Sequence, residues 1–129
     1  MMLVDTSVWI ELLNGTIGSK VTEADVLDFV TCGPILQEIL QGLSDEPATE
    51  VLRDSLLALP ILSDPAPIAL FLSAAEIYRL GRAKGYTIRS STDCLIAAIA
   101  IENGVPVWHK DRDFEAIAHY TSLRTRRMK

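Results

Sequence analysis

Five carboxylates in this chain lie beside short apolar segments, close to the points where helices or strands are expected to begin or end. They are Asp5, Glu38, Asp93, Asp111 and Asp113. Carboxylate oxygens, without a cysteine cluster or a well-placed histidine pair, suit Mg²⁺ or Mn²⁺ better than zinc. Water bound to such an ion can attack phosphorus, and the ion neutralises the charge that develops there. If the acids meet in one place, the pattern predicts hydrolysis of phosphate esters.

Mutual repulsion makes a converged set of acids costly unless a cation is present. The main set is Asp5, Glu38, Asp93 and Asp111. Carboxylates about 5 Å apart repel by roughly 3 kcal/mol per pair at an effective dielectric of about 20. A fold that gathers these acids would therefore need a cation among them, although their spacing in the chain does not establish that they converge.

Helix capping is the structural alternative for two of the acids. Asp5, with Thr6 and Ser7 after it, could accept hydrogen bonds from the free N–H groups of a helix start. Ser90 and Asp93 have the spacing of a capping box, with Asp in place of Glu. Capping and function are therefore both open at these positions.

The remaining three acids differ in how well a structural role explains them. Glu38 lies away from the apolar stripe of its helix and could simply face solvent. Either Asp111 or Asp113 could cap the helix expected from Phe114, and capping favours Asp113. That assignment leaves Asp111, just beyond a buried strand, without a structural task, and makes it a candidate for the site.

Short apolar strands alternate with helices along the chain, and these elements must position the acids. Strands are expected at Met2–Val4, Phe29–Cys32, Ile61–Leu62 and Val105–Trp108, with an edge strand at Ser122–Thr125. Helices are expected at Val8–Leu13 (halted by Asn14-Gly15), within Thr16–Asp28, and at Ile35–Leu43, Ala48–Leu59, Pro67–Lys84, Ser90–Asn103 and Phe114–His119. The alternation predicts an α/β fold with a parallel sheet flanked by helices. In such sheets, ligands bind beyond the carboxyl ends of the strands.

Composition limits the class of protein. The 129 residues suit one domain, and 49% of them are hydrophobic. No apolar run reaches the roughly 20 residues of a membrane span, and no secretory signal is visible. Two distant cysteines, Cys32 and Cys94, do not form a disulfide framework. These features predict a soluble protein of the reducing cytoplasm without a membrane partner.

Charge is distributed unevenly, although the net charge is −5. Residues 1–64 carry 11 acidic and 2 basic side chains, whereas residues 65–129 carry 6 acidic and 10 basic ones. Part of the basic excess is grouped at Arg79, Arg82, Lys84 and Arg89. Such a surface can attract a polyanion despite an acidic whole, and solvated helix ends are the alternative.

Three segments together resemble the PIN-domain ribonucleases, and among these the VapC toxins of bacterial toxin–antitoxin pairs. They are VDTSVWIELL near the N-terminus, GPILQEILQG around Glu38, and TIRSSTDCLIAAIAIENGVPVWHKDRDFEAIA in the C-terminal half. The resemblance runs over nearly the whole chain. It implies that residues 1–129 form a single PIN domain, an α/β/α sandwich of three layers around a small, mainly parallel sheet.

The resemblance also assigns roles to the acids. It implies that Asp5, Glu38, Asp93 and Asp111 form a catalytic quartet that binds Mg²⁺, with Mn²⁺ able to substitute, and that Asp113 is a secondary ligand. No position of the quartet is lost. The chain is therefore expected to be an active enzyme.

Residues next to the acids are candidates for binding water or RNA. Thr6 and Ser7 fill the hydroxyl position that follows the first acid, and Arg89 and Arg112 could contact the RNA backbone. His109 stands where many relatives carry Thr or Ser. A substrate contact, acid–base catalysis and a structural role are all open for His109.

The expected function is that of an endoribonuclease that cleaves structured RNA through a metal-activated water, leaving 5′-phosphate and 3′-hydroxyl ends. Members of the resembled family form homodimers and are neutralised by a cognate antitoxin, so a VapB-like partner is implied. A metal-dependent phosphohydrolase is one alternative, although Asp5-Thr6-Ser7 lacks the second Asp of a D-x-D motif. A non-catalytic interaction module and a nuclease acting on DNA are the others.

Overall fold

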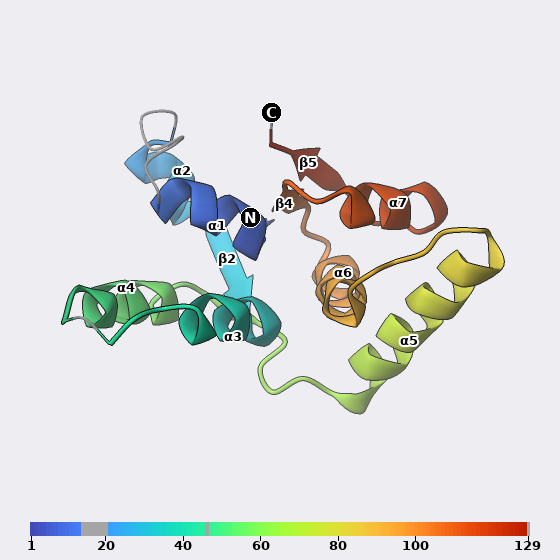
Figure 1. The fold of residues 1–129 in the computed structure, drawn as a ribbon, viewed down its shortest axis with the longest axis horizontal. Coiled ribbons are helices and arrows are strands. Elements are labelled where there is room, and N and C mark those ends of the chain that lie inside the picture. The colour runs from blue at the N-terminus through green and yellow to red at the C-terminus, as the bar shows by residue number, and fades with distance from the viewer. Residues whose placement is uncertain (14–20, 46, 129) are drawn as a thin grey trace.

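Parallel pairing joins the strands into one sheet. A computed structural model describes residues 1–13, 21–45 and 47–128. The strands are β1 (Met2–Val4), β2 (Phe29–Cys32), β3 (Ile61–Leu62), β4 (Val107–His109) and β5 (Thr125–Arg127). They lie in the order β3-β2-β1-β4-β5, and every neighbouring pair is parallel (Figure 1). The predicted parallel α/β fold is therefore confirmed.

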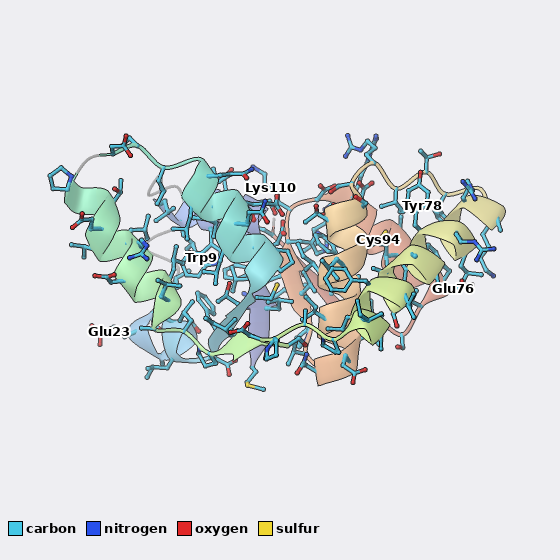
Figure 2. All side chains as sticks on the ribbon, turned by 90° about the horizontal axis from the view of Figure 1, so that it is seen from below. Trp9, Glu23, Glu76, Tyr78, Cys94 and Lys110 are labelled. Carbon is cyan, nitrogen blue, oxygen red and sulfur yellow. The ribbon has the colours of Figure 1, made fainter. Side chains whose placement is uncertain are left out.

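Seven helices of the described segments connect and cover the strands. They are α1 (Thr6–Leu13), α2 (Glu23–Leu27), α3 (Gly33–Gln41), α4 (Pro47–Leu57), α5 (Ile68–Ala83), α6 (Ser91–Asn103) and α7 (Arg112–Tyr120). Helix α6 has α3 and α4 to one side and α5 along the other, as both Figure 1 and Figure 2 show. No helix among the described residues is long and apolar enough to cross a membrane.

Most of the predicted boundaries lie within two residues of the observed ones, and the exceptions are informative. Helix α2 is the helix expected within Thr16–Asp28, and the first part of that range lies outside the described residues, as does the predicted stop at Asn14-Gly15. The edge strand was predicted at Ser122–Thr125, but β5 begins only at Thr125. This prediction was wrong because β5 carries two exposed arginines, and no apolar alternation marks it in the sequence.

The central strands are buried on both faces, which explains their continuous apolar sequences. Leu3 of β1 pairs with Val30 on one side and Val107 on the other, and Leu3 and Val4 are fully buried. Helix α6 is covered nearly all round as predicted, and its alanines allow neighbouring elements to pack closely. Cys94 of α6 is buried against α5, whereas Tyr78 of α5 is at the margin of the contact (Figure 2).

Close packing of α5 against α7 depends on Gly81. A Cβ added there would lie 2.8 Å from Cζ of Tyr120, whose hydroxyl donates to the carbonyl of Ile77 at 2.9 Å. We expect Gly81→Ala to lower the free energy of unfolding by about 1–3 kcal/mol, because overpacking outweighs the gain in helix propensity of about 1 kcal/mol.

Urea unfolding followed by circular dichroism measures this effect. Gly42→Ala is the matched control, because its added Cβ would make only ordinary contacts, the nearest at 3.6 Å. We expect a change of less than about 0.5 kcal/mol for the control. Equal stability of Gly81→Ala and the wild type would contradict the packing argument.

Candidate functional site

The carboxyl ends of the parallel strands meet at one edge of the sheet, and the acids are placed around that edge. Asp5 follows β1 and is buried, and Asp111 follows β4 after one residue. Glu38 lies in α3, the helix that β2 enters directly, and Asp93 lies in the first turn of α6. The sheet topology therefore brings together segments that are more than a hundred residues apart in the chain.

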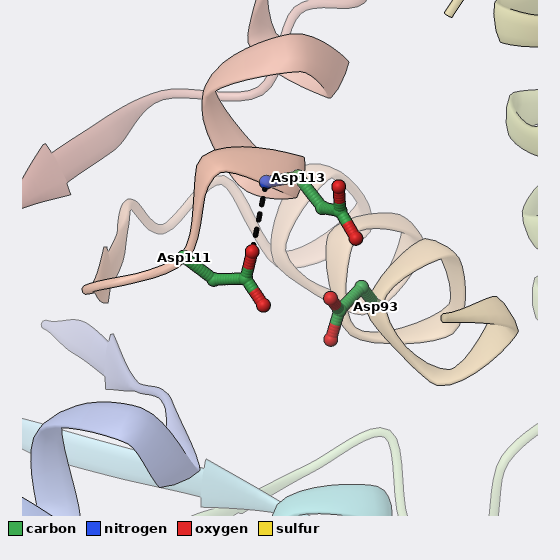
Figure 3. A group of neighbouring side chains, drawn as sticks. All are labelled: Asp93, Asp111 and Asp113. Atoms are coloured by element: carbon green, nitrogen blue, oxygen red, sulfur yellow. Dashed lines mark hydrogen bonds between the residues drawn. The ribbon is translucent and has the colours of Figure 1, made fainter. Parts of the chain in front are cut away.

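Three of the acids form a compact cluster. Asp93, Asp111 and Asp113 each offer a carboxylate oxygen, and these atoms all lie within 4.8 Å of one another (Figure 3). Asp93 and Asp113 are 7% and 3% exposed. Burial of two carboxylates beside a third is costly unless a cation or a proton compensates their charge. The cluster can therefore accept a metal ion.

Electrostatic effects on Asp93 connect the cluster with the other two acids. Burial is the largest cause of a rise in the pKa of Asp93 to about 8, and the charges of Asp5, Asp111, Asp113 and Glu38 contribute to the same rise in decreasing order. Burial and the charge of Asp5 likewise raise the pKa of Glu38. All five candidate acids thus contribute to one region of negative potential.

Glu38 does not simply face solvent. Its Oε1 atom is buried and has no hydrogen-bond partner within the described chain, as is also true of Oγ1 of Thr6. Glu38 also lines a cavity of about 590 Å³ between α3, α6 and the start of α5. Phe71, Gln37 and Gln41 contribute to the same cavity, and nothing in their sequence spacing indicated it.

The carboxylate of Asp5 is oriented by the start of α1. Its Oδ2 accepts a hydrogen bond of 2.6 Å from the hydroxyl of Ser7 and one of 3.2 Å from the Ser7 N–H. The Ser7 hydroxyl in turn accepts a bond from the backbone N–H of Lys110, just beyond β4. Asp5 is therefore both a capping residue and a neighbour of the acidic cluster, and Ser7 serves as a link between the two strand ends.

The predicted capping roles of Asp111 and Asp113 were wrong. Asp111 is the N-cap of α7, and its Oδ1 accepts a hydrogen bond from the N–H of Asp113 at 3.0 Å (Figure 3). Helix α7 begins at Arg112, two residues earlier than expected, so Asp113 lies inside the first turn. Its buried carboxylate instead accepts a bond from the N–H of Arg89.

The capping box that was one of the two open possibilities at Ser90 and Asp93 is absent. Ser90 is the N-cap residue of α6, but its side chain makes no capping hydrogen bond. Asp93 still benefits from its position in the first turn, because the helix dipole is positive there. Helix capping, which was the structural alternative to a functional role for Asp93, is therefore not observed.

Two arginines were predicted to contact substrate, and one of them lies against the cluster. Nη2 of Arg89 is 3.4 Å from Oδ1 of Asp111, and its Nε is 3.7 Å from Oδ2 of Asp113. The Arg89 side chain is 57% exposed, so it remains accessible from solvent. Arg112 is exposed at the start of α7. Both positions allow contact with a polyanion that approaches the acids.

His109 is fully buried at the end of β4 and cannot touch a substrate in this conformation. Its Nε2 lies 2.9 Å from Oε1 of Glu115, and its Nδ1 accepts a hydrogen bond from the N–H of Asp111. Of the roles left open by the sequence, the structure favours the structural one. Glu115 was not among the predicted residues, because a lone glutamate in an amphipathic helix carries no signal that it contacts a buried histidine.

Comparison with known proteins identifies the family. A profile of the PIN domain matches residues 2–120. A VapC ribonuclease of Mycobacterium bovis and ribonuclease VapC11 of Mycobacterium tuberculosis are each 39% identical over 130 residues, which cover 95% of this chain and 96% of each relative.

Solved structures share the fold. VapBC of Salmonella typhimurium bound to DNA matches with a TM-score of 0.74 at 16% identity, over 98% of this chain and 96% of that one. VapBC2 of Rickettsia felis, bound to a promoter fragment, matches with a TM-score of 0.73 at 15% identity, over 99% and 98% of the two chains. From the profile and the identity to its curated relatives, this chain belongs to the PIN-domain family and, within it, to the VapC ribonucleases.

Proposed function

We propose that this protein is a metal-dependent endoribonuclease and the toxin of a VapBC-type toxin–antitoxin pair. The observation that carries the proposal is the cluster of Asp93, Asp111 and Asp113, with carboxylate oxygens within 4.8 Å of one another at the carboxyl edge of the sheet. The names of the curated relatives supply the class of reaction. RNA is accordingly the proposed substrate, and structured loops are the proposed targets.

Mg²⁺ is the proposed ion, with Mn²⁺ able to replace it. The donors are oxygen atoms, and Oε1 of Glu38 and Oγ1 of Thr6 are two of the three buried side-chain oxygens that have no partner in the described chain. This donor set fits a hard divalent cation. The residues proposed to hold the ion are Asp5, Glu38, Asp93 and Asp111, with Asp113 as the secondary ligand that the family resemblance implies.

The protein's own residues would supply negative charge to the ion, orient the ligands and bind the RNA. Because the pKa of Asp93 is raised to about 8 in the metal-free protein, Asp93 must release a proton before it can bind a cation at neutral pH. Ser7 holds Asp5 in place, and the exposed Arg89 and Arg112 would bind phosphates of the RNA backbone. A bound divalent ion supplies positive charge that activates water and stabilises the phosphate in the transition state.

Cleavage of an end-labelled RNA hairpin tests the proposal. We expect cleavage with Mg²⁺ or Mn²⁺, none with EDTA, and products that carry 5′-phosphate and 3′-hydroxyl ends. A DNA hairpin of matched sequence should remain intact. Release of phosphate from a small phosphoester without RNA cleavage would favour the phosphohydrolase alternative, and absence of Mn²⁺ binding in calorimetry would favour the non-catalytic module.

The proposed partners are a VapB-like antitoxin and a second copy of this chain. Helix α5 exposes an apolar face, in which Ile68 is 72% exposed and Leu72 is 66% exposed. Such a face is a candidate for self-association. Residues 1–129 are proposed to act as one cytoplasmic PIN domain. Sedimentation of the purified chain, alone and with the protein encoded next to it, tests both associations.

A further inference from the structure

A line of hydrogen bonds runs from the edge strand β5 to the backbone of Asp111. The hydroxyl of Thr125 donates to Oε1 of Glu115 at 2.8 Å, and the same oxygen lies 2.9 Å from Nε2 of His109. On the other side of the imidazole ring, the N–H of Asp111 donates to Nδ1 at 3.1 Å. Thr125 of β5, Glu115 of α7 and His109 of β4 are thus connected to the acidic cluster through Asp111.

The chemistry of these groups fixes where the proton of His109 is. A backbone N–H can only donate, so Nδ1 must be unprotonated. A carboxylate can only accept, so Nε2 must carry the proton that it shares with Glu115. Hydrogen bonds from Thr125 and His109 lower the pKa of Glu115, in agreement with its role as an ionised acceptor. His109 is therefore a neutral imidazole in one defined tautomer.

These bonds constrain Asp111 from both ends. His109 holds its backbone N–H, and the N–H of Asp113 holds its Oδ1. These two hydrogen bonds therefore determine the orientation of the remaining carboxylate oxygen, Oδ2 of Asp111. An apolar residue at position 109 would fill the same buried space beside Phe114, but it could not hold the Asp111 backbone.

We propose that His109, oriented by Glu115, is a positioning residue that presents the Asp111 carboxylate to a divalent cation. This inference rests on the proposed metal site and adds His109 and Glu115 to it. The hydrogen bond between Thr125 and Glu115 links the site to β5. Groups that orient metal ligands from behind typically change metal affinity by about 10–100-fold when they are removed.

Paired substitutions of Glu115 separate position from charge. Glu115→Gln removes the negative charge but keeps an oxygen that can accept from both His109 and Thr125, whereas Glu115→Ala removes the acceptor. In calorimetry with Mn²⁺, we expect affinity to fall by at least about 10-fold for Glu115→Ala and by less than about 3-fold for Glu115→Gln. Equal losses would indicate long-range charge and overturn the positioning role.

Paired substitutions of His109 test the other half of the contact. Asparagine can present an acceptor close to the place of Nδ1, while the longer glutamine side chain reaches toward Glu115 and cannot accept from Asp111. We expect His109→Asn to keep Mn²⁺ affinity closer to the wild type than His109→Gln. Thermal unfolding monitors the fold of each variant, and the Glu115 pair, at a half-buried position, provides the test if both His109 variants unfold.

Nitrogen chemical shifts of His109 give a readout that is independent of activity. We expect the Nε2-protonated neutral tautomer in the metal-free protein, and a proton on Nδ1 would overturn the inference. If the wild type itself does not bind Mn²⁺, the proposed function fails. If the wild type binds Mn²⁺ and the Glu115 and His109 variants bind equally well, only the positioning role fails.

Discussion

Asp93→Asn should abolish RNA cleavage, with a loss in rate of at least about 1,000-fold, while the fold stays intact. Asp93 is buried at the centre of the acidic cluster, and the other four acids all act on it. An amide cannot supply the negative charge that holds a divalent cation there. A 1,000-fold loss corresponds to about 4 kcal/mol of transition-state stabilisation, a plausible size for the loss of a metal ion.

The measurement is single-turnover cleavage of an RNA hairpin with Mg²⁺, together with circular dichroism of each variant. Asp5→Asn is expected to behave in the same way. Glu102→Gln is the matched control, because Glu102 lies on the exposed side near the other end of α6. We expect the control to cleave at the rate of the wild type. Full activity of Asp93→Asn would remove the basis for the proposed site.

The metal-free protein should lose stability as the pH rises from about 4 toward about 8. Asp93 has an ordinary pKa of 3.8 and a pKa of about 8 in the folded protein. Between these values the folded chain binds a proton that the unfolded chain has released, so the free energy of unfolding falls with pH. One such group contributes a slope of at most about 1.4 kcal/mol per pH unit. The contribution of Asp93 is complete below pH 3.8 and is lost by about pH 8.

Other acids titrate in the same range, so a difference measurement isolates Asp93. Urea unfolding in EDTA at several pH values is compared between the wild type and Asp93→Asn, whose amide does not titrate. The variant should become progressively more stable than the wild type as the pH rises. Added Mn²⁺ should stabilise the wild type most at high pH, where no proton competes. A difference between the two proteins that does not change with pH would contradict the raised pKa of Asp93.

Sequence patterns predicted the sheet and helices well because both are dictated by local rules. Apolar runs such as Met2–Val4 lie in the buried centre of a parallel sheet, and glycine or proline punctuates most helices. The positions of the acids after strands and in first helical turns followed from the same patterns. Family resemblance, rather than spacing, supplied the expectation that the acids act together.

Details that depend on tertiary contacts could not be predicted. Asp111 and Asp113 are both acceptable helix caps, and the choice between them depends on the N–H of Arg89, which is brought near from another segment. The partnership of His109 and Glu115 depends on how α7 packs on β4. Likewise, the exposed arginines of β5 do not form a strand pattern in the sequence, and this segment is a strand because it pairs with β4.

Among the described strands, β1 precedes all the others in the chain, whereas its neighbour β4 comes fourth. Asp5 donates its N–H to the carbonyl of Trp108, and Ser7 accepts a bond from Lys110, so the N-terminal acid is held by a segment about a hundred residues later. The acids can therefore come together only after β4 and the first residues of α7 have been added to the chain and β4 has paired with β1.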